Sequence, residues 1–169
     1  RLLWVDRLGH TKPIVDEEAS YGPATLADDG RRLFVDIEQA NDPIYAYDLV
    51  SGTRNRLTKG WDAGYPSWSS EDGRLLFRSD QGGGDWRLFA MQATGGDAEL
   101  LLDREVTWLD DRSRHGSLAV AVYDAVTQAD IWLLSLTSRK ATVLLNSKDG
   151  ERFPALSPNG RLLAYVSDR

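Results

Sequence analysis

The chain has 169 residues, with 20 Lys and Arg against 26 Asp and Glu, a formal charge of −6, and no Cys. This length predicts a single domain, and the lack of Cys excludes a disulfide framework, a Cys-ligated zinc site and a thiol nucleophile. The negative charge argues against nucleic acid as a partner, because neutralising phosphates requires a basic surface. No apolar run approaches the ~18 residues of a membrane-spanning helix, so we expect no membrane insertion.

The first predicted elements are two short strands at residues 3–5 and 13–15. After them, four kinds of short strand recur in a fixed order, which we name a, b, c and d. Strand a is often led by Pro, and a turn such as Asp-Gly or Asn-Gly, typical of β-hairpins, joins it to b. The predicted strands a lie at residues 23–26, 66–69, 107–109 and 154–157, strands b at 33–35, 75–77, 118–122 and 162–166, strands c at 44–47, 88–91 and 131–134, and strands d at 56–58, 100–102 and 143–145.

The turn glycines Gly30, Gly73, Gly116 and Gly160 are 43, 43 and 44 residues apart. Four strands per unit at this period are typical of β-propeller blades, and no segment keeps the 3.6-residue periodicity of a helix. Strands b and c are apolar at nearly every residue, as in strands covered on both faces. The sequence therefore predicts an all-β fold, a β-propeller with four blade-equivalents of four antiparallel strands each, cut in mid-blade.

Two segments carry a resemblance to a known family. Residues 65–80 and 153–169 resemble the repeat of TolB-like β-propellers, which reads roughly Pro-x-Trp-Ser-Pro-Asp-Gly and is followed by an Ile-Tyr or Ile-Trp strand. Ile44-Tyr45 and Ile131-Trp132 match that last element. The third copy departs from the pattern, because residues 107–109 lack the Pro and residues 112–116 lack the Asp-Gly turn.

The register of the ends suggests a split blade. We assign residues 1–20 to its strands c and d, residues 21–63, 64–105 and 106–151 to three complete blades, and residues 152–169 to its strands a and b. Joining the two halves would remove two open sheet edges, which otherwise invite aggregation. A closed four-bladed ring, an eight-bladed ring of two chains, and an arc cut from a longer protein remain open.

The side chains that could carry catalysis do not form a recognisable motif. His10 and His115 are both expected in hairpin turns, without a matched nucleophile and acid. The pairs Asp28-Asp29 and Asp110-Asp111 would suit a glycosidase only if they faced one cleft, and Asp at a turn more often bonds its own backbone. We therefore predict no catalytic residue, no cofactor and no metal ligand in this chain.

An acidic residue follows strand b in each copy, six to eight residues after the turn glycine. We interpret these acids as caps of the b–c loops; a ring of carboxylates that binds a cation or a basic peptide is the alternative. Two tryptophans of neighbouring loops complete the candidate binding rim. Its residues are Asp36, Asp80, Asp124, Asp168, Trp61 and Trp86.

The resemblance implies a non-catalytic scaffold that binds a protein or peptide at its rim loops or central funnel, with homo-oligomer formation through the split blade as a further expectation. One alternative is a gating or substrate-recognition propeller of a larger enzyme, such as a serine peptidase. Another is a purely structural unit that assembles with itself. The resemblance also implies a periplasmic or other extracytoplasmic location.

Overall fold

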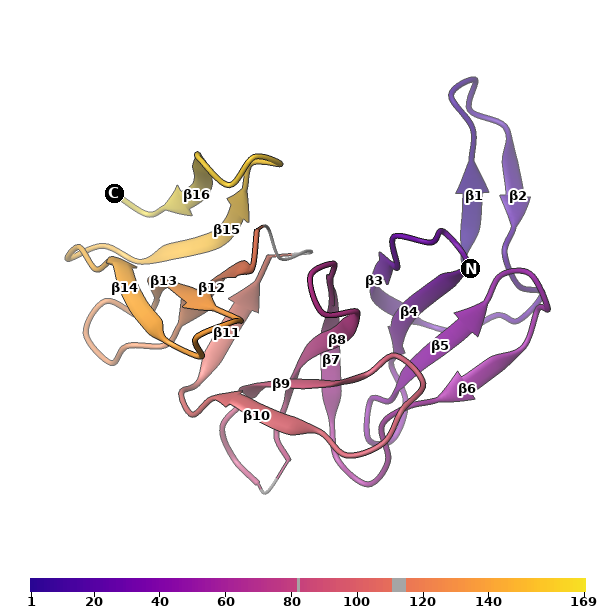
Figure 1. Cartoon of the computed structure of the whole chain (residues 1–169), viewed down its shortest axis with the longest axis horizontal. Coiled ribbons are helices and arrows are strands. Elements are labelled where there is room, and N and C mark those ends of the chain that lie inside the picture. The colour runs from indigo at the N-terminus through magenta and orange to yellow at the C-terminus, as the bar shows by residue number, and fades with distance from the viewer. Residues whose placement is uncertain (82, 111–114) are drawn as a thin grey trace.

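The computed structural model describes residues 1–81, 83–110 and 115–169. Within these ranges the regular elements are all β-strands, linked in chain order as antiparallel hairpins (Figure 1). They are β1 (Leu3–Val5), β2 (Thr11–Pro13), β3 (Tyr21–Leu26), β4 (Arg32–Ile37), β5 (Ile44–Asp48), β6 (Arg54–Arg56), β7 (Ala63–Ser69), β8 (Arg74–Ser79), β9 (Arg87–Gln92), β10 (Glu99–Leu102), β11 (Val106–Leu109), β12 (Ser117–Val122), β13 (Asp130–Ser135), β14 (Ala141–Leu145), β15 (Glu151–Leu156) and β16 (Leu163–Ser167).

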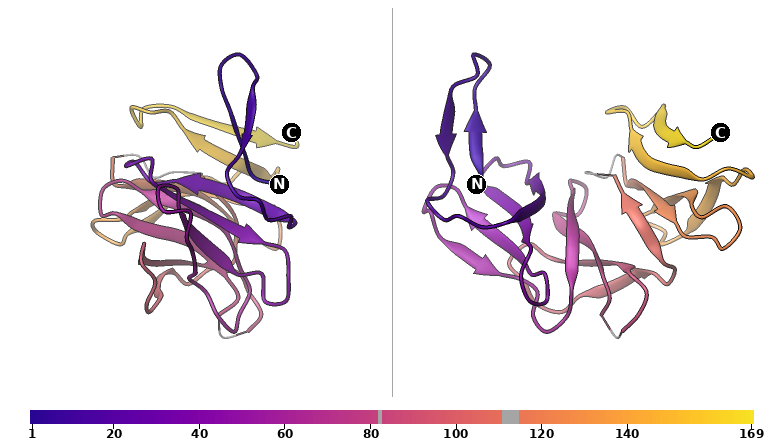
Figure 2. Two further views of the ribbon diagram at one scale, coloured as in Figure 1. Left: turned by 90° about the vertical axis from the view of Figure 1, so that its right-hand side faces the viewer. Right: turned by 180° about the vertical axis from the view of Figure 1, so that it is seen from behind.

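The strands form three sheets of four, β3–β6, β7–β10 and β11–β14, and two sheets of two, β1–β2 and β15–β16. The sheets stand side by side in an arc, with the two termini on either side of its opening (Figures 1 and 2). This arrangement confirms the predicted all-β propeller fold built from four-stranded antiparallel sheets. The terminal hairpins β1–β2 and β15–β16 are separate two-stranded sheets.

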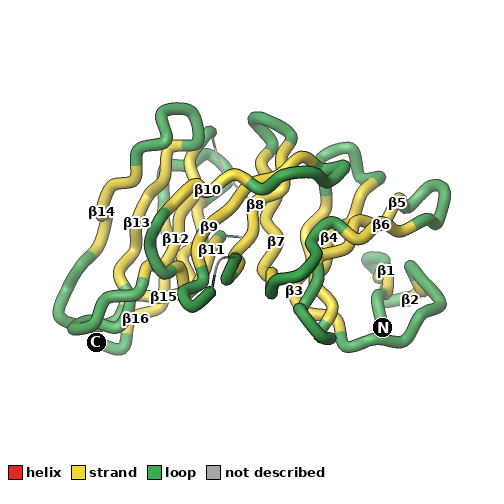
Figure 3. The backbone as a smooth tube through the Cα atoms, turned by 90° about the horizontal axis from the view of Figure 1, so that it is seen from below, coloured by secondary structure: helices red, strands yellow, loops and turns green. Residues whose placement is uncertain are grey.

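Each four-stranded sheet runs from the concave to the convex side of the arc. Its first strand faces the opening and its fourth lies outside, so that β6, β10 and β14 form the outer edge (Figures 1 and 3). Each first strand also carries a bulge near its start, between Gly64 and Ser67 in β7 and between Arg152 and Ala155 in β15, for example. A bulge bends the strand and redirects its side chains, so these four strands expose irregular backbone on the concave side.

The central residues of the second strand of a sheet are apolar because this strand supplies two cores at once. Along β8, Leu75 and Phe77 face the core shared with β3–β6, whereas Leu76 faces the core shared with β11–β14. Successive side chains of a strand point to opposite faces, so a sheet packed between two neighbours needs apolar residues on both. The same alternation places Phe34 of β4 opposite to Leu33 and Val35, which contact the N-terminal half-blade.

Two predicted strands end earlier than their apolar runs. The fourth strand of the first sheet stops at Arg56, and Leu57 and Thr58 follow it as buried residues outside the ladder. Thr58 Oγ1 accepts a hydrogen bond from the backbone N–H of Ile44 at 2.8 Å and so replaces a ladder partner. Likewise β2 ends at Pro13 rather than Val15. An apolar run in the sequence therefore indicates buried residues, and burial extends past the last residue that pairs in the sheet.

The a–b turns bear out the hairpin prediction where they are described. Gly30 and Gly160 take φ values of 63° and 65°, the left-handed conformation that such turns need. In the third copy His115 and Gly116 both have positive φ, 50° and 70°, whereas in the other copies only the glycine of the turn pair does. The rest of that irregular turn, residues 112–114, lies outside the described residues.

Candidate functional site

Three aromatic side chains line the concave side of the arc, one from each of the strands β7, β11 and β15. Tyr65 meets Trp108 edge to face with 4.8 Å between ring centroids, and Trp108 meets Phe153 in the same way at 4.7 Å. We call Tyr65, Trp108 and Phe153 the aromatic ladder. Phe153 remains 47% exposed, and the other two are partly exposed. The ladder is therefore an apolar surface that three separate blades share.

The backbone at both ends of the ladder is strained. Tyr65 and Phe153 have φ values of 55° and 53°, and each precedes a proline. Positive φ is rare for a bulky side chain and costs on the order of 1–3 kcal/mol. Both residues lie in the bulges of their strands. Strain that recurs at equivalent positions, and that presents partly exposed aromatic rings, points to a functional surface.

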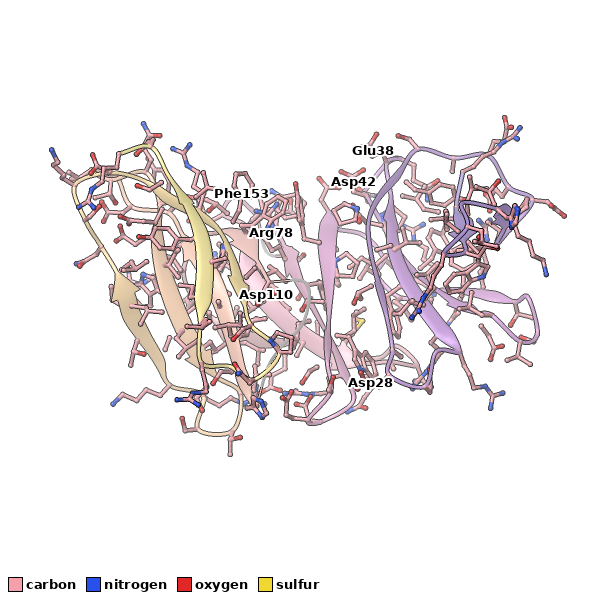
Figure 4. All side chains as sticks on the ribbon, turned by 90° about the horizontal axis from the view of Figure 1, so that it is seen from above. Asp28, Glu38, Asp42, Arg78, Asp110 and Phe153 are labelled. Carbon is pink, nitrogen blue, oxygen red and sulfur yellow. The ribbon has the colours of Figure 1, made fainter. Side chains whose placement is uncertain are left out.

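A half-buried arginine, Arg78, lies beside the ladder. The Arg78 guanidinium stacks over the Tyr65 ring at 4.1 Å and the Trp86 ring at 5.2 Å from their centroids. Its Nη1 donates hydrogen bonds to the carbonyl oxygens of Val106, at 3.0 Å, and Thr107. Burial lowers the pKa of Arg78, which nevertheless stays cationic because guanidinium titrates far above neutrality. Arg78 thereby ties the second sheet to the bulge of the third (Figure 4).

Asp36 of β4 lies between two inner strands and is 9% exposed. A methyl group placed on Gly22 of β3 would come within 2.3 Å of its Oδ2, and one on Gly64 of β7 within 3.2 Å. These glycines leave the room that the carboxyl occupies, and we call Asp36 with Gly22 and Gly64 the Asp36 slot. Burial, together with the charges of Asp42 and Glu38, raises the pKa of Asp36 to about 6, although Arg78 acts in the opposite direction.

The register corrects our assumption that the predicted rim acids occupy one repeated position. Asp80 and Asp168 are equivalent, because each accepts a hydrogen bond from the backbone N–H that precedes the first strand of its blade, Asp62 at 2.9 Å and Gly150 at 2.7 Å. In the first sheet Glu38 holds that position, and its backbone N–H bonds to Ser20. Asp36 lies two residues earlier, inside β4.

Asp124 is different again, since it accepts hydrogen bonds from the backbone N–H groups of Val126 and Thr127 within its own loop, which lower its pKa. Among the predicted acids it therefore caps the b–c loop as our interpretation described. Asp80 and Asp168 instead tie the end of strand b to the start of strand a. These acids do not form one ring around the axis, because the spacing from the turn glycine does not equal the register.

The two predicted tryptophans lie in different surroundings. Trp86 belongs to the site, because its ring covers Arg78. Trp61 stacks on Phe77 at 5.9 Å with nearly parallel rings and lines a groove of about 500 Å³ between the first two sheets. Arg56, Lys59 and the 94–98 turn also line that groove. Trp61 thus contributes more to the core than to the ladder.

The paired turn acids hold neighbouring blades together. Asp28 Oδ2 accepts a hydrogen bond from the Trp68 indole at 3.0 Å, and Asp110 Oδ2 accepts one from the backbone N–H of Leu156 at 2.7 Å. Figure 4 places Asp28 near the edge opposite to Glu38 and Asp42. Asp29 caps its own turn by accepting from the Arg31 N–H. Asp111 lies outside the described residues.

Sequence reasoning missed the ladder and Arg78. The available signal was the residue before the strand-a proline, which is aromatic in Tyr65-Pro66 and Phe153-Pro154. In the third copy Trp108 holds the position of Tyr65, eight residues before the turn glycine, and Leu109 replaces the proline. Arg78 interrupts an otherwise apolar strand b, and a lone cation in a strand covered on both faces indicates a specific partner.

No family model matches this chain, and none of the curated proteins does. Solved structures do: TolB from Acinetobacter baumannii is 17% identical, with a TM-score of 0.74 over 93% of this chain and 40% of its own. A putative TolB from Agrobacterium tumefaciens is 15% identical, with a TM-score of 0.77 over 95% of this chain and 58% of its own.

The tricorn protease matches with a TM-score of 0.67 and 11% identity, over 93% of this chain and 17% of its own. This chain thus spans 40% and 58% of the two TolB chains.

In the described ranges no helix is long and apolar enough to cross a membrane. The strand order, the turn chemistry and these likenesses agree that the chain adopts the TolB-type β-propeller fold.

Proposed function

We propose that this chain is a non-catalytic propeller scaffold that binds a protein or peptide on the concave side of its arc. The observation that carries the proposal is the aromatic ladder, whose rings are partly exposed and come from three blades. Large aromatic side chains on a rigid support dominate the energetics of many protein interfaces. Peptide binding there would also explain why two of the rings sit on strained backbone. By family resemblance we further propose an extracytoplasmic location.

The test is a selection of random 12-residue peptides on the immobilised chain, followed by affinity measurement on variants. We expect Trp108→Ala and Phe153→Ala each to weaken selected peptides about thirtyfold or more, the effect of an interface hot spot of about 2 kcal/mol. Trp4→Ala is the matched control, because Trp4 is 41% exposed on the distant β1 strand, and it should change affinity less than twofold. Peptides that bind all three variants as tightly as the parent chain would contradict the proposal.

The likeness to the tricorn protease favours a second proposal, in which the same surface belongs to a gating or substrate-recognition propeller of a larger enzyme. The concave surface then meets a passing substrate chain instead of a stable partner. Peptides selected on the ladder would distinguish the two through their kinetics. Residence times of seconds or more favour the scaffold, and millisecond exchange favours the gate.

A third proposal concerns assembly through the split blade. Strands β1 and β16 each end a two-stranded sheet, so their outer backbone groups form open edges. Several large apolar side chains of these two sheets are more than two-fifths exposed. They are Leu3, Trp4, Val5, Tyr165 and Val166. We propose that β1 of one copy pairs with β16 of another and completes a four-stranded blade.

The complete blades supply the register for this pairing. In the second sheet Arg78 lies opposite both Gly64 on strand a and Leu88 on strand c. Val166 holds the position of Arg78, because it lies opposite Arg152 at the same bulge. Strand c of the completed blade would therefore bring its equivalent of Leu88 opposite Val166.

Residues 2–6 align with residues 44–48, since Asp6 and Asp48 each accept a hydrogen bond from the N–H two residues on. Leu2 then lies opposite Val166, and Leu3 opposite Tyr165. Because the chain has no Cys, a mixture of the single variants Leu3→Cys and Tyr165→Cys can be oxidised without competing thiols. We expect a disulfide-linked heterodimer, since directly opposed residues have Cβ atoms about 4.5–5.5 Å apart.

The control replaces Tyr165→Cys by Ala164→Cys, whose side chain points to the other face of the strand. It should give at least fivefold less cross-linked product. Equal yields from both mixtures, or a monomeric mass for the unmodified chain at high concentration, would exclude pairing between copies in this register.

A further inference from the structure

The Asp36 slot holds a polar atom that the fold itself does not satisfy. Asp36 is 9% exposed, and its Oδ1 has no hydrogen-bond partner among the residues that the structure describes. Burying a carboxylate without a partner is costly, and proteins seldom keep such a group unless it has a use. Gly22 and Gly64 both lack a side chain where one would collide with this carboxyl or crowd it. Two strands thus accommodate Asp36, and neither bonds its Oδ1.

The charges around the slot are mostly negative. Glu38 and Asp42 lie near enough to disfavour ionisation of Asp36, and Asp42 and Asp80 act on Asp62 in the same way. Figure 4 shows Glu38 and Asp42 along the same edge of the molecule. The positive charge of Arg78, on the far side of Gly64, acts against these negative charges. Arg78 Nη1, however, already donates to two backbone carbonyl oxygens, and the guanidinium plane stacks on two aromatic rings. It does not form an ion pair with Asp36 among the described contacts.

The donor set is unsuited to a metal ion. Within the described residues no three carboxylate or imidazole groups converge as a metal site would require. One carboxylate with a free oxygen, near further acids and beside the edge of the Trp86 ring, suits an organic cation instead. A methyl group on Gly64 would lie 3.9 Å from Trp86, so the indole borders the slot. Lys and Arg stems pack well on apolar and aromatic surfaces while their charged heads bond to carboxylates.

We infer that the Asp36 slot receives the ammonium or guanidinium head of a Lys or Arg side chain of a partner, with Oδ1 of Asp36 as the acceptor. The inference rests on the proposed binding function and specifies it: the partner carries a basic residue next to the segment that covers the aromatic ladder. Asp36, Glu38 and Asp42 supply the attraction, and Gly22 and Gly64 leave the room that the Asp36 carboxyl itself occupies.

The experiment uses n-butylammonium and n-butylguanidinium as probes for the two side chains, and n-butanol as the neutral control. Nuclear magnetic resonance follows the Asp36 carboxyl carbon and the amides of Gly22 and Gly64 during titration at pH 7.5. We expect saturable shifts with both cations and none with butanol. In Asp36→Asn the affinity should fall at least tenfold, because the neutral amide keeps the shape and removes the charge.

Asp103→Asn is the matched control, since Asp103 is an exposed acid that pairs with Arg87 elsewhere on the surface. It should leave probe affinity within twofold. Equal affinity of the parent chain and Asp36→Asn, or equal shifts with butanol, would overturn the inference. The proposed function fails differently: if selected peptides ignore Trp108→Ala the ladder is not the binding surface, whereas peptides sensitive to Trp108→Ala but not to Asp36→Asn refute only the slot.

Discussion

Asp36→Asn is expected to raise the free energy of unfolding at pH 8 by up to about 3 kcal/mol and to leave it nearly unchanged at pH 3. The pKa of Asp36 rises from 3.8 to about 6 in the folded chain, and each pKa unit corresponds to about 1.4 kcal/mol. Because the folded state binds the proton more tightly than the unfolded state, stability falls as the pH rises from about 4 to about 6. Above that range the folded chain bears the full free-energy cost of burying the ionised carboxylate, and the neutral Asn side chain removes that cost.

Urea unfolding of both chains between pH 3 and pH 8 measures this difference. Asp124→Asn is the control of opposite sign, because backbone hydrogen bonds lower the pKa of Asp124 and its charge favours the folded state. That variant should lose stability at pH 8 and not at pH 3. A constant difference between Asp36→Asn and the parent chain at all pH values would show that burial does not perturb this carboxyl.

A stabilising substitution at Asp36 would support the binding proposal made for the slot. Natural proteins often keep groups that cost stability where a ligand needs them, and replacing such a group strengthens the fold while weakening function. The same variant therefore gives two independent readings. Higher stability with lost cation binding fits a functional site. Higher stability with unchanged cation binding indicates that the Asp36 carboxyl destabilises the fold without contributing to binding.

The fold could be predicted from the sequence because its signals are local and repeated. Gly30, Gly73 and Gly160 mark hairpin turns, and runs such as Leu75-Leu76-Phe77 report a strand covered on both faces. Four copies in phase made the propeller architecture the simplest interpretation, because each blade needs a neighbour on either face to bury both sides of its strand b.

The site could be predicted only in part, because counting residues from a turn does not give the register. Asp36 lies six residues after its turn glycine and Asp80 lies seven residues after its own. The strand pairing nevertheless gives Asp36 the position that Arg78 holds in the second sheet, two residues before the position of Asp80. A shift of one residue in a strand moves a side chain to the other face. The bulges that turn Tyr65 and Phe153 into their strained conformations depend on cross-strand pairing, which no single segment encodes.

Phe77→Ala is expected to lower the free energy of unfolding by about 3–5 kcal/mol, the usual cost of removing a buried aromatic ring. Phe77 is fully buried, and its ring stacks between Trp61 at 5.9 Å and Phe89 at 6.1 Å. The cavity would open in the core between β3–β6 and β7–β10, where blade-to-blade contact is the main source of burial. Unfolding by urea at pH 7, followed by tryptophan fluorescence, measures the loss.

Phe153→Ala provides the matched control, since it removes the same ring from a site that is 47% exposed. We expect it to cost clearly less than Phe77→Ala, because about half of the Phe153 ring is already exposed to solvent and less burial is lost. Similar losses in the two variants would mean that the ladder is part of the core and not a binding surface. A large loss at Phe77 with a small one at Phe153 would instead separate the residues that hold the blades together from those left free to meet a partner.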